Sequence, residues 1–297
     1  MYEHRYRENK LHGQPEFPLH IYRVEHQARV HSILPVHWHN EMEIIYLAEG
    51  RATFYIESRE FTIQAGDALI VHPGELHSGM DTVSGGTCYY SIVFKCSWLS
   101  SPYPDRVQSL FLDPLLQGTT RLPALLSAAD DTHTPLLYLI KELLNRYEHQ
   151  SAAYELSLKA HLLLFIADSY QYGLTRKNPE PEPRHRREYN RQIREVLSYM
   201  EQHSRDRLEL DQLASVVSLS RSHFCKFFKA QTGMRPMEYL NYIRISQAAS
   251  LLRSGSYNVL EAALESGYQH VSYFSKWFRH YMNMTPSDYK ARYSSGV

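Results

Sequence analysis

Apolar residues recur with two different periods along this chain. Between residues 34 and 95 they form short runs separated by turn-forming pairs such as Gly50-Arg51 and Pro73-Gly74. Such spacing is typical of short antiparallel strands, and it predicts strands over residues 42–48, 52–56, 61–63, 68–72 and 87–94. Beyond Trp98 the apolar positions fall at i, i+3, i+4 and i+7, which indicates helices. We therefore expect an α+β protein whose N-terminal domain is a small antiparallel barrel or sandwich.

Two helical stripes follow the predicted strands: Leu136, Leu139, Ile140, Leu143, Leu144 and Tyr147, then Leu158, Leu162, Phe165 and Ile166. Part of these stripes must cover the barrel. The excess could pair two chains, and plain core packing is the alternative.

A change of composition separates the two predicted domains. Residues 175–188 are rich in Pro, Glu and Arg and poor in apolar side chains, which is typical of a linker. The expected division is therefore a sensing domain over 1–175, with a helical dimerisation segment from about 106, a linker over 176–189 and a helical domain over 190–297. Residues 1–30 are polar and leave open whether they form an arm or the first strands.

The last hundred residues contain the same helical unit twice. Eight positions recur fifty residues apart, namely Ser222, Phe224, Lys226, Phe228, Lys229, Met234, Pro236 and Tyr239, then Ser272, Phe274, Lys276, Phe278, Arg279, Met284, Pro286 and Tyr289. Each copy predicts two helices and a tight turn, over 211–217 and 220–231, then 258–266 and 271–282. Asp211 and Asn258 are N-cap residue types, and Thr285-Pro286 predicts the start of a last short helix. One continuous helix over 237–253 would join the copies.

The second helix of each copy has one apolar face. Phe224, Phe227 and Phe228 fall at i, i+3 and i+4, and so do Phe274, Trp277 and Phe278, so we expect both sets in the core. The other face is small or basic, as a helix that reads a DNA groove requires. The candidate DNA-binding residues are Ser220, Arg221, Ser222, Cys225, Lys226, Lys229, His270, Ser272, Tyr273, Ser275, Lys276 and Arg279. A plain bundle with a solvated basic face is the alternative, and two copies in register argue against it.

Charge divides along the same boundary. From Arg184 onward there are 17 Lys and Arg against 10 Asp and Glu, net +7, which leaves 15 against 22, net −7, for residues 1–183. The basic part therefore suits a polyanion such as double-stranded DNA, whereas the acidic part does not.

The C-terminal pattern resembles the AraC/XylS family of bacterial transcription regulators. The resemblance rests on Leu213-Ala214, Ser220, Phe224, Lys226, Phe228-Lys229, Gly233, Pro236, Tyr239, Arg244, Ala248, Leu251-Leu252, Ala262-Ala263, Gly267-Tyr268, Phe274, Phe278 and Pro286. It implies a sequence-specific regulator, usually an activator, that contacts RNA polymerase, works as a homodimer and responds to a small effector such as a sugar. It also implies that the chain has no catalytic residues and is not an enzyme.

One constellation in the strand-rich part carries candidate chemistry. Two segments, 37–43 with Gly50 and then Gly66 with 73–77, resemble the two signature segments of the cupin barrel family. In the metal-binding members of that family, the metal ligands are the residues that match His37, His39, Glu43 and His77. Alternation along one extended strand would place His37, His39, Glu41 and Glu43 on one face. Imidazole and carboxylate ligands suit zinc, iron, nickel or manganese. The second segment is one residue longer than the cupin pattern between Gly66 and Pro73, and no matching Asn follows.

Three interpretations of this constellation stay open. It could line an organic-effector pocket together with Trp38 and Tyr46, whose rings suit a sugar, or it could hold a divalent metal, or its histidines could only hydrogen-bond inside the barrel. A rival of another class is a cupin-type metalloenzyme with a DNA-binding tail.

Cysteine usage and hydropathy bear on the compartment. Cys88, Cys96 and Cys225 show no paired spacing, which suits a reducing environment. No apolar run approaches about 18 residues, and the first residues lack the apolar segment of a signal peptide. We therefore expect a cytoplasmic protein.

Overall fold

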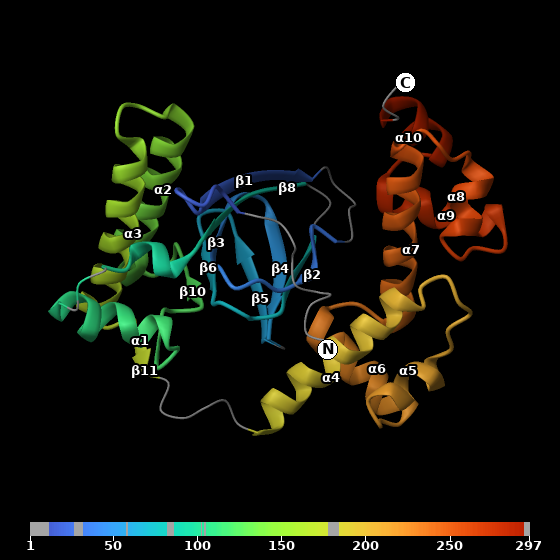
Figure 1. Ribbon diagram of the computed structural model, residues 1–297, viewed down its shortest axis with the longest axis horizontal. Helices are drawn as coiled ribbons and strands as arrows, with labels where there is room; N and C mark the ends of the chain where they lie inside the picture. The colour runs from blue at the N-terminus through green and yellow to red at the C-terminus, as the bar shows by residue number, and fades with distance from the viewer. Residues whose placement is uncertain are drawn as a thin grey trace.

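The computed structural model describes residues 12–26, 32–57, 59–81, 86–101, 103, 105–177 and 184–293, and the structural statements below refer to these. Two β-sheets occupy the centre of the molecule, a helix pair covers one side of them, and an all-helical domain lies on the other side (Figure 1). None of the described helices is long and apolar enough to cross a membrane.

All but two of the described strands form two antiparallel sheets. One has the order β1 (Leu19–His26), β8 (Thr87–Phe94), β3 (Met42–Glu49), β6 (Ala68–Val71) and β10 (Leu125–Leu126). The other has the order β2 (Leu34–His37), β7 (His77–Asp81), β4 (Arg51–Ile56) and β5 (Arg59–Gln64). Among the described residues no strand pairing joins the two sheets, so the expected cupin-like barrel is built as a sandwich that backbone hydrogen bonds do not close.

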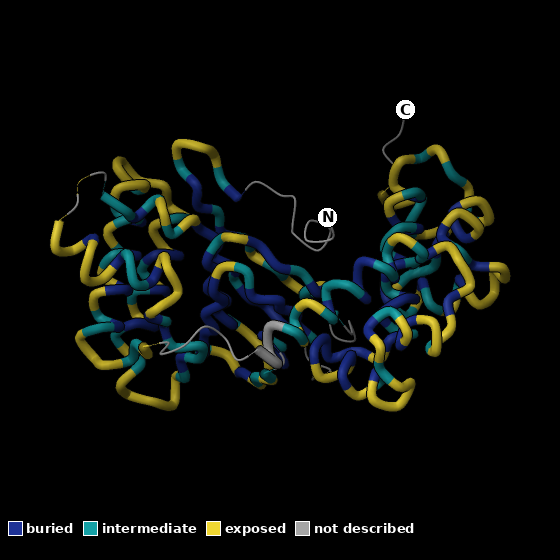
Figure 2. Tube along the Cα trace, turned by 60° about the horizontal axis from the view of Figure 1, so that its bottom comes forward, coloured by how far each residue is buried: buried dark blue, intermediate teal, exposed yellow. Residues whose placement is uncertain are grey.

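Successive side chains of β3 point to opposite faces of the sheet and pack in two separate cores. Ile45 and Leu47 face the second sheet and pack with Phe54 and Ile56 of β4 inside the sandwich. Met42, Ile44 and Tyr46 point the other way, into a core shared with the helix pair. The strand is buried on both faces, which explains its near-continuous apolar sequence. Figure 2 shows that buried segments gather in the middle of the molecule.

The helix pair is α2 (Thr134–His149) and α3 (Tyr154–Gln171). Both predicted stripes pack on the five-stranded sheet, with Leu139 and Tyr147 only partly buried, so the expectation that they cover the strands is confirmed. Short elements lead into the pair: η1 (Cys96–Leu99), η2 (Gln108–Leu112), α1 (Asp113–Leu116), β9 (Thr120–Arg121) and η3 (Asp131–His133).

The all-helical domain follows the predicted repeat. Its helices are α4 (Arg184–Gln202), α5 (Leu210–Val216), α6 (Arg221–Thr232), α7 (Pro236–Arg253), α8 (Val259–Glu265), α9 (Val271–Met282) and α10 (Pro286–Tyr293). The Asn258 side chain accepts a hydrogen bond from the backbone N–H of Glu261 in a capping box, as its residue type predicted. Asp211 is not a cap, because Glu209 and Gln212 form the box that begins α5 one residue earlier.

The sequence leaves open whether residues 1–30 form an arm or the first strands, and the structure has a strand there, β1; residues 1–11 and 27–30 of this stretch lie outside the described residues. Two elements differ from the expected linker. β11 (Arg176–Lys177), paired with β9, and the start of α4 at Arg184 both fall inside the predicted linker. Net charge and proline content do not by themselves exclude a helix, since α4 is amphipathic and anchors its later turns through Ile193, Val196 and Leu197.

Candidate DNA-binding and sensor sites

The core faces of the two predicted reading helices are as expected. In α6, Phe224, Phe227 and Phe228 are all buried, and in α9 Phe274 and Phe278 are fully buried while Trp277 is only partly so. Each helix is also ended by a residue in the left-handed conformation, Gly233 at φ +78° and Asn283 at φ +55°. The two copies thus present equivalent helices in equivalent settings.

The opposite faces of both helices are open to solvent. Ten of the twelve candidate DNA-binding residues are exposed, and Cys225 and Ser275 are intermediate. Ser220 caps α6 by accepting from the N–H of His223, and His270 occupies the N-cap position of α9 without a capping hydrogen bond from its side chain. A groove of about 600 Å³ runs between the two faces, lined by Cys225, Lys226 and Lys229 from α6 and by Tyr273 and Trp277 from α9. The two reading faces therefore flank one side of the domain.

Helix α7 fixes the separation of the two units. Arg244 on this helix donates from Nε to the carbonyl of Ser204 at 2.6 Å and from Nη2 to the carbonyl of Asp206 at 2.8 Å, and its guanidinium lies 5.7 Å from the ring centroid of Tyr268. The Tyr281 hydroxyl of α9 donates to the Glu238 carbonyl at 2.9 Å. Both helical units are therefore attached to the same rigid helix.

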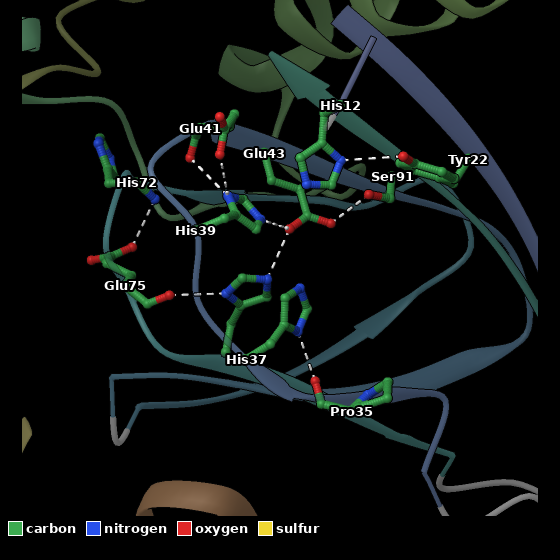
Figure 3. Close-up of polar contacts among 11 residues, drawn as sticks. His12, Tyr22, Pro35, His37, His39, Glu41, Glu43, His72, Glu75 and Ser91 are labelled. Atoms are coloured by element: carbon green, nitrogen blue, oxygen red, sulfur yellow. Dashed lines mark hydrogen bonds and ion pairs between the residues drawn. The ribbon is translucent and has the colours of Figure 1, made fainter. Parts of the chain in front are cut away.

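The sandwich holds a cluster of four polar side chains, three of them buried. His37, His39, Glu43 and His77 each offer a ligand atom, and these atoms all lie within 4.8 Å of one another (Figure 3). They come from β2, the turn after it, β3 and β7. Glu41 does not join them, because the segment 37–43 turns between β2 and β3 and is not one extended strand.

Each histidine of the cluster is oriented by its backbone surroundings. The Nδ1 atoms of His37, His39 and His77 lie 2.8, 3.1 and 2.9 Å from the carbonyl oxygens of Pro35, Glu41 and Glu75. A carbonyl can only accept, so Nδ1 carries the proton in all three rings. Nε2 is then the atom through which each ring could bind a metal ion, after losing any proton that it carries, which is the arrangement found around metal-binding histidines.

Glu43 is the only carboxylate of the cluster. Its Oε2 lies 3.2 Å from Nε2 of His39 and 2.9 Å from Nε2 of His77, and the Ser91 hydroxyl donates to Oε1 at 2.5 Å. Burial would raise the pKa of Glu43, but the positive charge of His77 and the hydrogen bond from His39 outweigh burial and hold that pKa well below its usual value. Burial alone would lower the pKa of His77, because it disfavours the charged imidazolium. The negative charge of Glu43 outweighs burial, so the pKa of His77 is raised.

Two aromatic residues expected in the same pocket lie elsewhere. Tyr46 is on the opposite face of β3 from Glu43, under the helix pair. Trp38 points away from its two histidine neighbours into the core of the helical domain, where the Arg194 guanidinium lies 4.7 Å from its ring centroid. Sequence reasoning missed Ser91 and Arg194. The strand register could have indicated Ser91, whereas no local pattern identifies Arg194 as a contact of the sandwich.

Comparison with known proteins agrees with this arrangement. Residues 18–166 match the family described as the AraC-like ligand binding domain, and residues 213–292 match a helix-turn-helix domain family. The chain belongs to the AraC family of DNA-binding transcription regulators, with an N-terminal ligand-binding domain.

Several curated regulators are similar over nearly their whole length. The HTH-type transcriptional regulator YdeC of Bacillus subtilis is 25% identical over 282 residues, covering 94% of both chains. The HTH-type transcriptional activator RhaS of Escherichia coli is 26% identical over 293 residues, covering 94% of this chain and 95% of its own. Among solved structures, the DNA-binding domain of AdpA in complex with a target DNA is 29% identical over 34% of this chain and 91% of its own, with a TM-score of 0.33. ToxT from Vibrio cholerae is 15% identical over 96% of this chain and 100% of its own, with a TM-score of 0.40.

Proposed function

We propose that this chain is a transcription activator that reads a two-part DNA site with α6 and α9, and that a divalent metal ion bound by His37, His39, Glu43 and His77 is part of its signal. The observation that carries the sensor half is the orientation of three histidines, each with Nδ1 against a backbone carbonyl, two of which also place Nε2 within 3.2 Å of the Glu43 carboxylate. Activation is the direction supported by the likeness to RhaS, which is named an activator.

The DNA half follows from the exposed faces. Two helices fixed to one rigid helix would enter successive major-groove segments whose centres lie about one turn, or 10 to 10.5 base pairs, apart. Ser222 and Ser272 are short side chains that would touch base edges only at close approach, and Tyr273 beside Ser272 would contribute to which bases are preferred. Lys226, Lys229, Lys276 and Arg279 are long enough to reach either a base edge or a phosphate.

The donor set of the cluster fits a metal ion. Three imidazoles and one carboxylate suit zinc, iron, nickel or manganese, and His39, Glu43 and His77 are each 2% exposed or less, so an ion bound by them would be held inside the sandwich. When bound, the ion would draw the four side chains to one point and offer open positions to an oxygen-bearing effector. A sugar is one such effector, although neither Trp38 nor Tyr46 supplies a stacking surface at the cluster.

Metal analysis tests the sensor half. Protein without an affinity tag is incubated with zinc, iron, nickel and manganese, and we expect one ion per chain. Replacing His39 and His77 with Ala should remove the ion and the stability it adds, about 2.7 kcal/mol when the free ion is 100 times its Kd. The matched control replaces His149 and His161, whose Nδ1 atoms also face a carbonyl but which lie outside the cluster. Unmodified protein that takes up none of the four metals would refute the ion site.

Binding rather than turnover is the proposed action of the sensor. An effector-dependent change in DNA affinity without conversion of the effector supports the regulator. A stoichiometric ion together with turnover of a small substrate would instead support the metalloenzyme. Because its partner is DNA, the chain is proposed to act in the cytoplasm, in contact with RNA polymerase.

Dimerisation is proposed through the outer face of the helix pair. A groove of about 860 Å³ lies between η2 and α3, and its lining is almost entirely apolar, including Phe111, Leu163, Leu164 and Tyr170. Leu164 is 50% exposed, and such a patch on a folded chain marks an interaction site. Leu164→Glu should give monomers in light scattering at concentrations where the unmodified chain is dimeric. Tyr138→Glu, a change at an exposed residue of α2 outside the groove, should not.

A further inference from the structure

The strands that carry the histidine cluster also form the contact with the DNA-binding domain. Along β2 and the start of β7, cluster residues alternate with residues that belong to the core of the helical domain. His37, His39 and His77 face the cluster, while their neighbours Val36, Trp38 and Leu76 belong to the same hydrophobic core as Ile193, Leu197 and the phenylalanines of α6. One peptide unit therefore separates each histidine from the domain interface.

Arg194 of α4 contacts both segments of the cluster. Its Nη2 donates to the Gly74 carbonyl at 2.7 Å, and its guanidinium lies 4.7 Å from the ring centroid of Trp38. The N–H of Gly74 in turn donates to the His39 carbonyl at 2.7 Å. Arg194 therefore links α4 to Trp38, which precedes His39 in the chain, and to Gly74, which is hydrogen-bonded to the His39 carbonyl.

A second contact comes from the reading helix α6. The Ser78 hydroxyl, next to His77, donates to the Thr232 carbonyl at 3.2 Å at the last residue of α6. Gly233 follows at φ +78°, and a Cβ there would lie 2.4 Å from the ring of Tyr55. The end of a DNA-reading helix thus lies directly on the strand that carries His77.

The loop between the two histidine segments is also held from the sensor side. Glu75 is buried, accepts from Arg121 Nη1 of β9 at 2.8 Å and from the N–H of His72 at 2.9 Å, and its carbonyl orients His77. The loop 72–76 is therefore clamped between Arg121 and Arg194. A displacement of one contact is transmitted to the other because the loop has little freedom to absorb it.

We propose that filling of the cluster and docking of the DNA-binding domain are one coupled equilibrium, in which Arg194 is a positioning residue. The docked arrangement already brings the four ligand atoms within 4.8 Å of one another, so it is the arrangement competent to bind. Binding must then favour docking by the same factor by which docking favours binding. The inference rests on the proposed ion site and adds its regulation.

Zn²⁺ titration of the full chain tests the coupling. Arg194→Ala should raise the Kd for Zn²⁺ about tenfold, within the range usual for coupled sites. Ser78→Ala, a milder change at the other contact, should shift it in the same direction by a smaller factor. The control is Arg191→Ala on the same helix, whose ion pairs to Glu188 and Glu195 lie within α4, and it should change the Kd less than about twofold.

Small-angle scattering supplies the reciprocal measurement. Arg194→Ala should have a larger radius of gyration than the unmodified chain, and saturating Zn²⁺ should reduce the difference. Zn²⁺ binding of equal strength in Arg194→Ala and the unmodified chain, with no Zn²⁺-dependent change in radius, would overturn the coupling and leave the ion site standing. Absence of Zn²⁺ binding by the unmodified chain would overturn both.

Discussion

Replacement of the two exposed cations of α9, Lys276 and Arg279, by Ala isolates the contribution of the second helical unit to DNA binding. Five Lys and Arg side chains lie on the two reading faces, and Arg221 already has an ion-pair partner, Asp211, at 3.6 Å. The other four are Lys226, Lys229, Lys276 and Arg279. If each neutralises one phosphate, the slope of log affinity on log salt is about −3.6, and the double replacement reduces it to about −1.8.

Fluorescence anisotropy between about 50 and 200 mM KCl measures this slope for one copy of the site. If Lys276 reads a base, the slope of the unmodified chain is only about −2.7 and falls to about −1.8 on replacement, and the additional loss, about 1–3 kcal/mol, is confined to sequences with the preferred base. The control replaces two exposed sensor cations, Lys95 and Lys141, which changes net charge equally and should leave the slope unchanged. A slope that stays the same after the α9 replacement would mean that this helix does not contact DNA.

Two further substitutions test the rigidity and the docking of the helical domain. Arg244→Ala removes two charge-assisted hydrogen bonds to the loop before α5 and should destabilise the domain by about 2–4 kcal/mol. The control, Arg253→Ala, changes an exposed arginine on the same helix and should cost less than about 0.5 kcal/mol. Equal shifts in melting temperature for the two variants would contradict this. Gly233→Ala should separate the domains in small-angle scattering, because its Cβ would meet the Tyr55 ring. Gly173→Ala at φ +65°, with nothing within 4 Å, carries only the backbone strain, about 1–2 kcal/mol, and should leave the domains docked.

Local signals account for most of what the sequence predicted correctly. The repeated helices, the Asn258 cap and the stripes of α2 and α3 depend on neighbours within one or two turns, and the structure places them within a few residues of the predicted bounds. The sequence also predicts strands β3, β4 and β8. A strand that is buried on one face or on both has a strong apolar pattern. The sequence does not predict β1, because the strand includes the polar residues His20, Tyr22 and Arg23 and so has no strong apolar pattern.

Contacts between distant segments could not be predicted in the same way. His37, His39, Glu43 and His77 were grouped by resemblance, and the structure brings them together, but Trp38 and Tyr46 were grouped with them on composition alone and face other cores. Which side of a strand meets the second sheet and which meets another domain depends on tertiary packing. Arg194 illustrates the limit, because its partner Gly74 lies 120 residues away.

Hydroxyl-radical footprinting of the full chain on a site selected in vitro tests the central claim most directly. The chain should protect paired segments on one face of the duplex, with centres about 10 to 10.5 base pairs apart. Reversing the charge of Lys276 and Arg279 together to Glu should remove one segment of each pair and leave the other. Protection confined to a single groove segment, or an unchanged footprint after the charge reversal, would show that α9 only supports the first unit and does not read DNA.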